Sequence, residues 1–129
     1  MYVTDTHAFL WFLSEDRRLG KEANKAFVSC DNGTDIIVIP TIALMESIFI
    51  CENKRLSLGF DKVLEKLSQY PLNYRIYPLD MRVIMKCKEI PELRHPHDRI
   101  ITATSITLNA TLITKDKIIQ DSKLVNTIW

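Results

Sequence analysis

The sequence predicts an α/β fold in which a central, mostly parallel five-stranded sheet is flanked by helices. Short β-rich runs alternate along the chain with segments whose apolar residues recur three and four positions apart, as in helices that cover a sheet. Residues 36–39 are an unbroken apolar run, which is typical of a strand buried on both faces. A length of 129 residues, with no fixed repeat and no linker-like stretch, suits a single domain over residues 1–129.

The β-branched and aromatic content of five runs predicts the strands. In chain order these are residues 2–4, 35–40, 74–79, 111–114 and 125–129. The helical spacing of apolar residues predicts helices between them, over residues 6–13, 20–30, 41–55, 60–70 and 81–90. Because a helix separates most consecutive strands, we expect the strands to be parallel and to be joined by crossovers.

Residues 95–110 are rich in Ile and Thr, so propensity alone would also allow a strand. We predict a helix. Pro96 suits the first helical turn, Asp98 favours a helix N-terminus, and Asn109 is an acceptable left-handed end.

The charges of the chain nearly cancel. There are 17 Lys and Arg against 16 Asp and Glu, for a net charge of +1, and 47% of the residues are hydrophobic. This composition excludes a disordered chain and a strongly cationic binder of nucleic acid or membranes. The charge is unevenly divided, since residues 1–80 hold 9 basic and 11 acidic groups and residues 81–129 hold 8 and 5. Basic residues clustered around one site could therefore still attract the phosphate backbone of a nucleic acid.

No segment has the character of a membrane span or a secretory signal. The longest uncharged run, between Arg99 and Lys115, is interrupted by Thr, Ser and Asn, and Asp5 precedes the first apolar stretch with no basic residue before it. The chain has three cysteines, which are Cys30, Cys51 and Cys87. They are far apart and have no metal-ligand spacing, so we expect reduced, buried thiols in a cytoplasmic protein that does not contact a membrane.

Two carboxylates follow predicted strands. Asp5 comes after residues 2–4, and Asp116 comes after residues 111–114. In open α/β sheets ligands bind beyond the carboxyl ends of the strands, which makes both acids candidates for chemistry. Taken alone, each acid is explained equally well as the N-cap of a helix.

Glu46 lies within a helical segment whose residues three and four positions away are all apolar, so we expect its face to be buried. A buried carboxylate is costly unless it is paired, protonated or bound to a cation, and no Lys or Arg lies within a helical turn of it. A salt bridge to a distant basic residue is the alternative. We favour a functional role.

Asp98 is explained by helix-dipole stabilisation when taken alone. Together, however, Asp5, Glu46, Asp98 and Asp116 come from four successive βα units. Four carboxylates gathered at one sheet edge would repel one another unless they surround a cation. An all-oxygen site suits Mg²⁺ or Mn²⁺ better than zinc.

In their order and spacing, these segments resemble the PIN-domain ribonucleases, and most closely the toxins of VapBC-type toxin–antitoxin systems. The similarity runs nearly end to end. It is carried by DTHAFLWFLSED at residues 5–16, TIALMES at 41–47, HPHDRIITATS at 95–105, TLITKD at 111–116 and a closing strand that ends in Trp129.

The resemblance implies a PIN-like fold and a metal-dependent endoribonuclease that hydrolyses RNA phosphodiester bonds, as the toxin of a type II toxin–antitoxin pair. The family's metal-binding acids map onto Asp5, Glu46, Asp98 and Asp116, with Mg²⁺ or Mn²⁺ as the cofactor. The implied partners are RNA, a small cognate antitoxin that occupies the pocket and the neighbouring groove, and a second copy of the chain as a homodimer.

We assign Asp5, Asp98 and Asp116 as metal ligands, and Glu46 as a ligand or as an orienter of metal-bound water. One or two ions are both compatible with this set. The candidate substrate contacts are Thr114, which matches the family's polar residue before the last acid, and the flanking basic residues Arg99, Lys115 and Lys117.

Where relatives often read Asp-Pro-Phe-Asp-Arg, this chain has His95, Pro96, His97, Asp98 and Arg99. An auxiliary acid and an aromatic residue are thus replaced by histidines, which are weaker candidates for phosphate contacts. A histidine-rich zinc site is not expected, because no third His or Cys stands at ligand spacing.

Three other residues near these segments have ordinary structural explanations. Asp121 is predicted to be a surface turn residue, and Trp11 and Phe12 are predicted to pack in the core.

Two other functions are compatible with this fold class. A receiver-like phosphoacceptor domain would also have a strand-end Asp with Mg²⁺, but it would carry an acidic pair after its first strand, where this chain has Asp5 alone. A catalytically silent PIN-like binding module is the other, and retention of all four acids argues against it.

Overall fold

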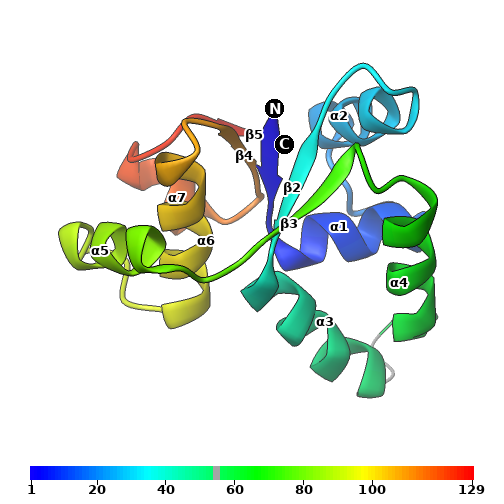
Figure 1. The fold of residues 1–129 in the computed structure, drawn as a ribbon, viewed down its shortest axis with the longest axis horizontal. Helices are drawn as coiled ribbons and strands as arrows, with labels where there is room; N and C mark the ends of the chain where they lie inside the picture. Colours follow the sequence, from blue (N-terminus) through cyan, green and yellow to red (C-terminus); the bar gives the residue numbers. More distant parts are fainter. Residues whose placement is uncertain (54–55) are drawn as a thin grey trace.

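The computed structural model describes residues 1–53 and 56–129, and its centre is a sheet of five strands. The strands are β1 (Tyr2–Thr4), β2 (Ile37–Pro40), β3 (Tyr74–Tyr77), β4 (Thr111–Ile113) and β5 (Thr127–Ile128). They lie in the order β3-β2-β1-β4-β5, and each neighbouring pair is parallel (Figure 1). The predicted α/β class is confirmed, and the sheet is parallel throughout.

β1 occupies the middle of the sheet. Val3 pairs with Val38 of β2 on one side and with Leu112 of β4 on the other, and these three side chains are at most 3% exposed. Such burial on both faces explains the apolar strand sequences. The strand order reverses between β1 and β4, and in open α/β sheets this switch point is where ligands bind.

The strand order also shows that the receiver-like interpretation is wrong. Receiver domains have the order 2-1-3-4-5, in which the first strand lies between the second and the third. Here β1 lies between β2 and β4.

Seven helices are present in the described part of the chain. They are α1 (Thr6–Leu13), α2 (Lys21–Asp31), α3 (Thr41–Glu52), α4 (Phe60–Gln69), α5 (Met81–Glu89), α6 (Pro96–Thr107) and α7 (Lys117–Ser122). Figure 1 shows α5, α6 and α7 on one side of the sheet and α2 and α4 on the other, which agrees with the predicted flanking helices.

The helix predicted over residues 95–110 is confirmed as α6. Pro96 occupies its first turn, and Asn109 just beyond its end has a φ of +49°, the left-handed conformation expected of a helix stop. The helix predicted over residues 41–55 ends earlier, at Glu52, and residues 54 and 55 lie outside the described residues.

α7 was not predicted, and Asp121 lies within it rather than in a turn. The helix has six residues, which is too short to show an apolar repeat. Its start was nonetheless marked in the sequence by Asp116, whose side chain caps it.

The core includes aromatic contacts between α1 and α2. Phe12 stacks on Phe27 with ring centroids 4.6 Å apart, and Trp11 is 2% exposed, so the predicted packing of both α1 aromatics is confirmed. The C-terminal Trp129 packs on Trp11 and against Gly20 so closely that a Cβ at position 20 would overlap it.

All three cysteines are free thiols. Cys30 is buried, whereas Cys51 and Cys87 are half-buried. Within residues 1–53 and 56–129, no helix has the length and apolar character that crossing a bilayer requires.

Candidate metal and substrate site

A pocket of about 400 Å³ lies at the switch point of the sheet. Its walls come from the start of α1, from α3, from the start of α6 and from the segment that joins β4 to α7. The residues that line it are Asp5, Thr6, His7, Glu46, His95, Asp98, Ile101, Lys115, Asp116 and Lys117. The structure therefore brings all four predicted acids to this acid pocket.

Asp5 follows β1 and caps α1, since its Oδ1 accepts a hydrogen bond from Ala8 N at 2.7 Å. Burial raises the pKa of its carboxyl from the ordinary 3.8 to about 6, although the Thr114 hydroxyl, the Ala8 N–H and His7 act in the opposite direction. The negative charge of Glu46 adds to the rise. Asp5 is thus a helix cap and a pocket carboxylate at once.

Glu46 reaches the pocket from α3. The Thr6 hydroxyl donates to its Oε2 at 2.5 Å, and His97 Nδ1 lies 3.5 Å from its Oε1. The expectation that its helix face is buried is wrong in part, because Phe49 is 51% exposed and the Glu46 side chain is 25% exposed. Because the Glu46 carboxylate faces the pocket and remains partly exposed, it avoids the free-energy cost of a fully buried charge.

Asp98 lies in the first turn of α6, with its Oδ2 3.3 Å from His95 Nδ1. Partial burial raises the pKa of its carboxyl, with His95 opposing the rise and the charges of Asp116 and Glu46 adding to it. Asp116 caps α7 by accepting hydrogen bonds from the backbone of Ile118 and Ile119, at 2.8 and 3.1 Å. Both acids therefore face the pocket while stabilising a helix start.

The ionised forms of Asp5 and Asp98 are disfavoured in the pocket, because burial and neighbouring carboxylates raise the pKa values of both groups. A divalent cation would relieve this repulsion, and carboxylate oxygens are the ligands that Mg²⁺ and Mn²⁺ take. In residues 1–53 and 56–129, no group of three or more His, Cys, Asp or Glu side chains is arranged closely enough to hold a metal ion without side-chain movement. The argument for a metal in this pocket therefore rests on the carboxylate oxygens, which are suitable ligands, and on the repulsion between the carboxylates, which a cation would relieve.

The predicted substrate contacts are divided between three places. Lys115 and Lys117 line the pocket, and Lys115 Nζ lies 4.2 Å from the centre of the Trp11 ring. Thr114 is fully buried, and its hydroxyl accepts a hydrogen bond from Asp116 N at 3.1 Å. Arg99 instead faces α5, where its Nε donates to the carbonyl of Cys87 at 2.8 Å.

Sequence reasoning missed two lining residues, Thr6 and His7. They directly follow Asp5, and that adjacency was the available signal. Thr6 is 2% exposed, and its hydroxyl holds Glu46 across the pocket.

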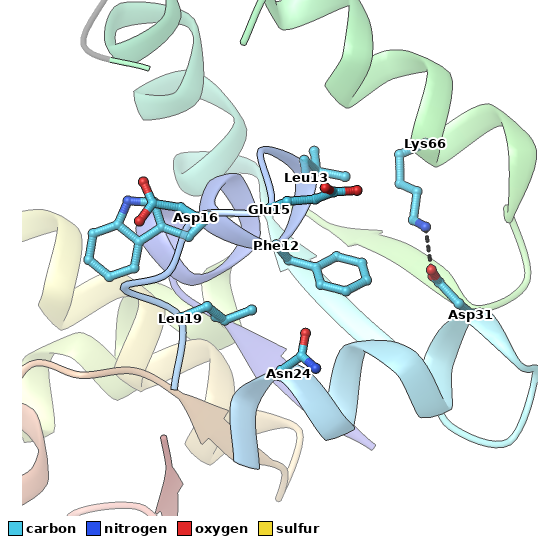
Figure 2. A pocket seen from close by; sticks show the side chains of 9 residues that line it. Phe12, Leu13, Glu15, Asp16, Leu19, Asn24, Asp31 and Lys66 are labelled. Atoms are coloured by element: carbon cyan, nitrogen blue, oxygen red, sulfur yellow. Dashed lines mark hydrogen bonds and ion pairs between the residues drawn. The ribbon is translucent and has the colours of Figure 1, made fainter. Parts of the chain in front are cut away.

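A second hollow, of about 530 Å³, is shown in Figure 2. Its wall includes Trp11, whose ring centre lies 4.2 Å from Nζ of the acid-pocket residue Lys115. Phe12, Leu13 and Leu19 give it apolar walls. On its far side, Lys66 Nζ of α4 pairs with Asp31 Oδ2 at 2.6 Å.

The sequence model of the PIN domain family matches residues 2–123. The chain belongs to the PIN domain family. The match covers all four pocket acids, so the predicted family resemblance is confirmed.

Several known proteins are similar to this PIN-domain chain. Ribonuclease VapC22 of Mycobacterium tuberculosis is 27% identical over 117 residues, which are 89% of this chain and 86% of that protein. The crystal structure of VapBC2 from Rickettsia felis bound to a promoter DNA fragment includes a chain that superposes with a TM-score of 0.72 at 17% identity, covering 99% of this chain and 98% of that one. A chain of FitAcB from Neisseria gonorrhoeae superposes with a TM-score of 0.69 at 18% identity, covering 100% and 97%.

Proposed function

We propose that this PIN-domain protein is a Mg²⁺- or Mn²⁺-dependent endoribonuclease and the toxin of a type II toxin–antitoxin pair. The observation that carries the proposal is the gathering of Asp5, Glu46, Asp98 and Asp116 in one pocket at the switch point of the sheet. The similarity to a protein named as a VapC ribonuclease supports RNA as the substrate.

The reaction is hydrolysis of a phosphodiester bond. A divalent ion bound there would supply an activated water and neutralise charge on the attacked phosphate and the leaving oxygen. Asp5, Asp98 and Asp116 would hold the ion, and Glu46 would act as a ligand or orient its water. The Thr6 hydroxyl fixes the Glu46 carboxylate, and the two caps fix Asp5 and Asp116 on the starts of α1 and α7.

RNA is held by the basic rim of the pocket. Lys115 and Lys117 line it and can contact phosphates, and the Trp11 ring under Lys115 limits where that ammonium group can lie. Arg99 contacts a more distant phosphate or serves only to join α6 to α5, since it faces α5.

A small antitoxin is the proposed protein partner. Several similar solved structures are of VapBC or FitAB assemblies, which supports a partner of this kind. We place the antitoxin over the acid pocket and the adjoining hollow of Figure 2, where it would exclude RNA. The protein would act in the cytoplasm, where its RNA substrates are.

A second copy of the chain is the other proposed partner. Met81, Ile84 and Met85 of α5 are 69%, 41% and 51% exposed, an apolar surface of the kind that often marks an interface. Light scattering of the purified chain is expected to give twice the monomer mass, and a monomer mass at micromolar concentration would contradict the dimer.

The test of the proposed function is RNA cleavage by purified variants. Asp98→Asn is expected to abolish cleavage in the presence of Mg²⁺, because it removes a metal ligand. Asp121→Asn is the matched control, since Asp121 is an exposed acid on α7 outside the pocket, and it is expected to cleave like the wild type. Full activity of Asp98→Asn would overturn the proposal.

The same proteins also test the catalytically silent alternative. A metal that binds only the folded state must stabilise it, so Mg²⁺ or Mn²⁺ is expected to raise the melting temperature of the wild type and of Asp121→Asn. No thermal shift, together with no cleavage, would favour a silent binding module.

A further inference from the structure

All three histidines of the chain lie at the acid pocket. His7 and His95 line it, and His97 lies beside Glu46, which also lines it. They come from the first turn of α1 and from the start of α6, so the fold brings together residues that are far apart in sequence. Imidazole is a common protein ligand for transition metals.

Two of the three imidazoles face carboxylates of the pocket. His95 Nδ1 lies 3.3 Å from Asp98 Oδ2, and His97 Nδ1 lies 3.5 Å from Glu46 Oε1. With metal–ligand bonds of about 2.0–2.3 Å, neighbouring ligands of one ion lie about 3.0–3.5 Å apart. The two pairs have that separation, which is longer than the usual N–H···O hydrogen bond of about 2.7–3.2 Å.

Both rings are also accessible to an ion from solution. The His95 and His97 side chains are 63% and 41% exposed, and their rings stand at 89° with centroids 5.4 Å apart. Pro96 separates them in the chain, and its ring restricts the backbone between them. The two nitrogens are therefore presented beside two different carboxylates of the same pocket.

We propose that His95 and His97 are imidazole ligands of the metal in the acid pocket, and that they make it bind a divalent transition-metal ion more tightly than Mg²⁺. Carboxylates alone suit Mg²⁺, whereas imidazole nitrogen suits later transition metals. The spacing argument against a histidine zinc site does not apply, because the carboxylates of the acid pocket, Asp98 and Glu46 beside the two imidazoles among them, would supply the remaining ligands. The inference rests on the proposed function, since it assigns further ligands to the same site.

Calorimetric titration with Mg²⁺ and with Co²⁺ tests the selectivity. The double variant His95→Asn/His97→Asn is expected to lose about ten-fold or more of its Co²⁺ affinity, the size of effect common for metal-site substitutions. Its Mg²⁺ affinity is expected to be unchanged, because asparagine retains an oxygen donor. His7→Asn is the matched control, since it removes an imidazole that lines the pocket and acts on Asp5 only through longer-range charge, without an ion pair of the kind that His95 and His97 make with carboxylates. It is expected to keep both affinities. An equal loss for both metals, or no loss for Co²⁺, would overturn the inference.

Pulsed electron paramagnetic resonance of the Mn²⁺-loaded protein gives a readout independent of affinity and activity. Directly bound imidazole is expected to give a nitrogen hyperfine coupling in the wild type and in His7→Asn, and the double variant is expected to lack it. If Mn²⁺ binds and RNA is cleaved but no nitrogen coupling appears, the inference fails and the proposed function stands. If no divalent metal binds the wild type, both fail.

Discussion

Replacing Asp5 by asparagine should abolish metal-dependent cleavage and yet stabilise the metal-free protein. Asparagine keeps the helix cap, because its side-chain oxygen can accept the hydrogen bond that Ala8 N now donates. What it removes is a carboxyl whose pKa is raised from 3.8 to about 6, chiefly by burial. A raised pKa means that the folded chain holds a proton that the unfolded chain has already released.

The sign and size of the effect follow from that difference. Between about pH 4 and pH 6 the folded state binds more protons, so the free energy of unfolding of the wild type falls as the pH rises through this window. At about 1.4 kcal/mol for each pH unit, the rise from 3.8 to about 6 corresponds to a loss of up to about 3 kcal/mol above pH 6. Asp5→Asn does not undergo this loss.

Urea denaturation in excess chelator measures the effect. At pH 7.5 the variant is expected to unfold with a free energy up to about 3 kcal/mol above that of the wild type, and the difference should shrink as the pH approaches 4. Asp35→Asn is a control, because Asp35 is a partly exposed acid outside the pocket. A variant that is no more stable than the wild type at pH 7.5, or a difference independent of pH, would refute the reasoning.

Two further pairs of substitutions test the packing around the sheet. Gly20→Ala should lower the free energy of unfolding by about 1–3 kcal/mol, because the added methyl overlaps Trp129, whereas Gly59→Ala, with no atom within 4 Å of the new Cβ, should have little effect in the same urea titration. Thr102→Val should be neutral or stabilising by about 1 kcal/mol in thermal unfolding, because the Thr102 hydroxyl is the one buried side-chain polar atom in the described residues without a hydrogen-bond partner. Thr104→Val should instead destabilise, because it removes a hydroxyl that donates to a backbone carbonyl at 2.8 Å.

Much of the fold could be predicted because its elements carry strong local signals. The four buried residues of β2 follow directly from an apolar run, and α6 was separable from a strand by Pro96 and Asn109 at its two ends. α7 was not predictable in the same way, because six residues with one buried side chain show no repeat. Segment ends also differed by a few residues, since backbone hydrogen bonding decides them and side-chain pattern does not.

Some features of the candidate site could likewise be predicted from local sequence, whereas others depend on tertiary packing. The positions of Asp5 and Asp116 follow from strand ends, and Glu46 was identifiable because apolar residues surround it in sequence. Which side chains lie beside these acids depends on how α1, α3 and α6 pack, and no local pattern records that. The Thr6 contact with Glu46 spans 40 positions in the chain, and the orientation of Arg99 toward α5 reflects the close packing of α5 and α6.

The central claim is that the acid pocket hydrolyses RNA by means of a bound divalent metal. The most direct measurement follows RNA cleavage by one wild-type preparation before chelation, in excess chelator, and after Mg²⁺ or Mn²⁺ is restored above the chelator concentration. We predict that cleavage stops in chelator and returns with the metal, because negatively charged carboxylates alone cannot neutralise the charge on the attacked phosphate and the leaving oxygen. Cleavage that continues at full rate in excess chelator would contradict the claim.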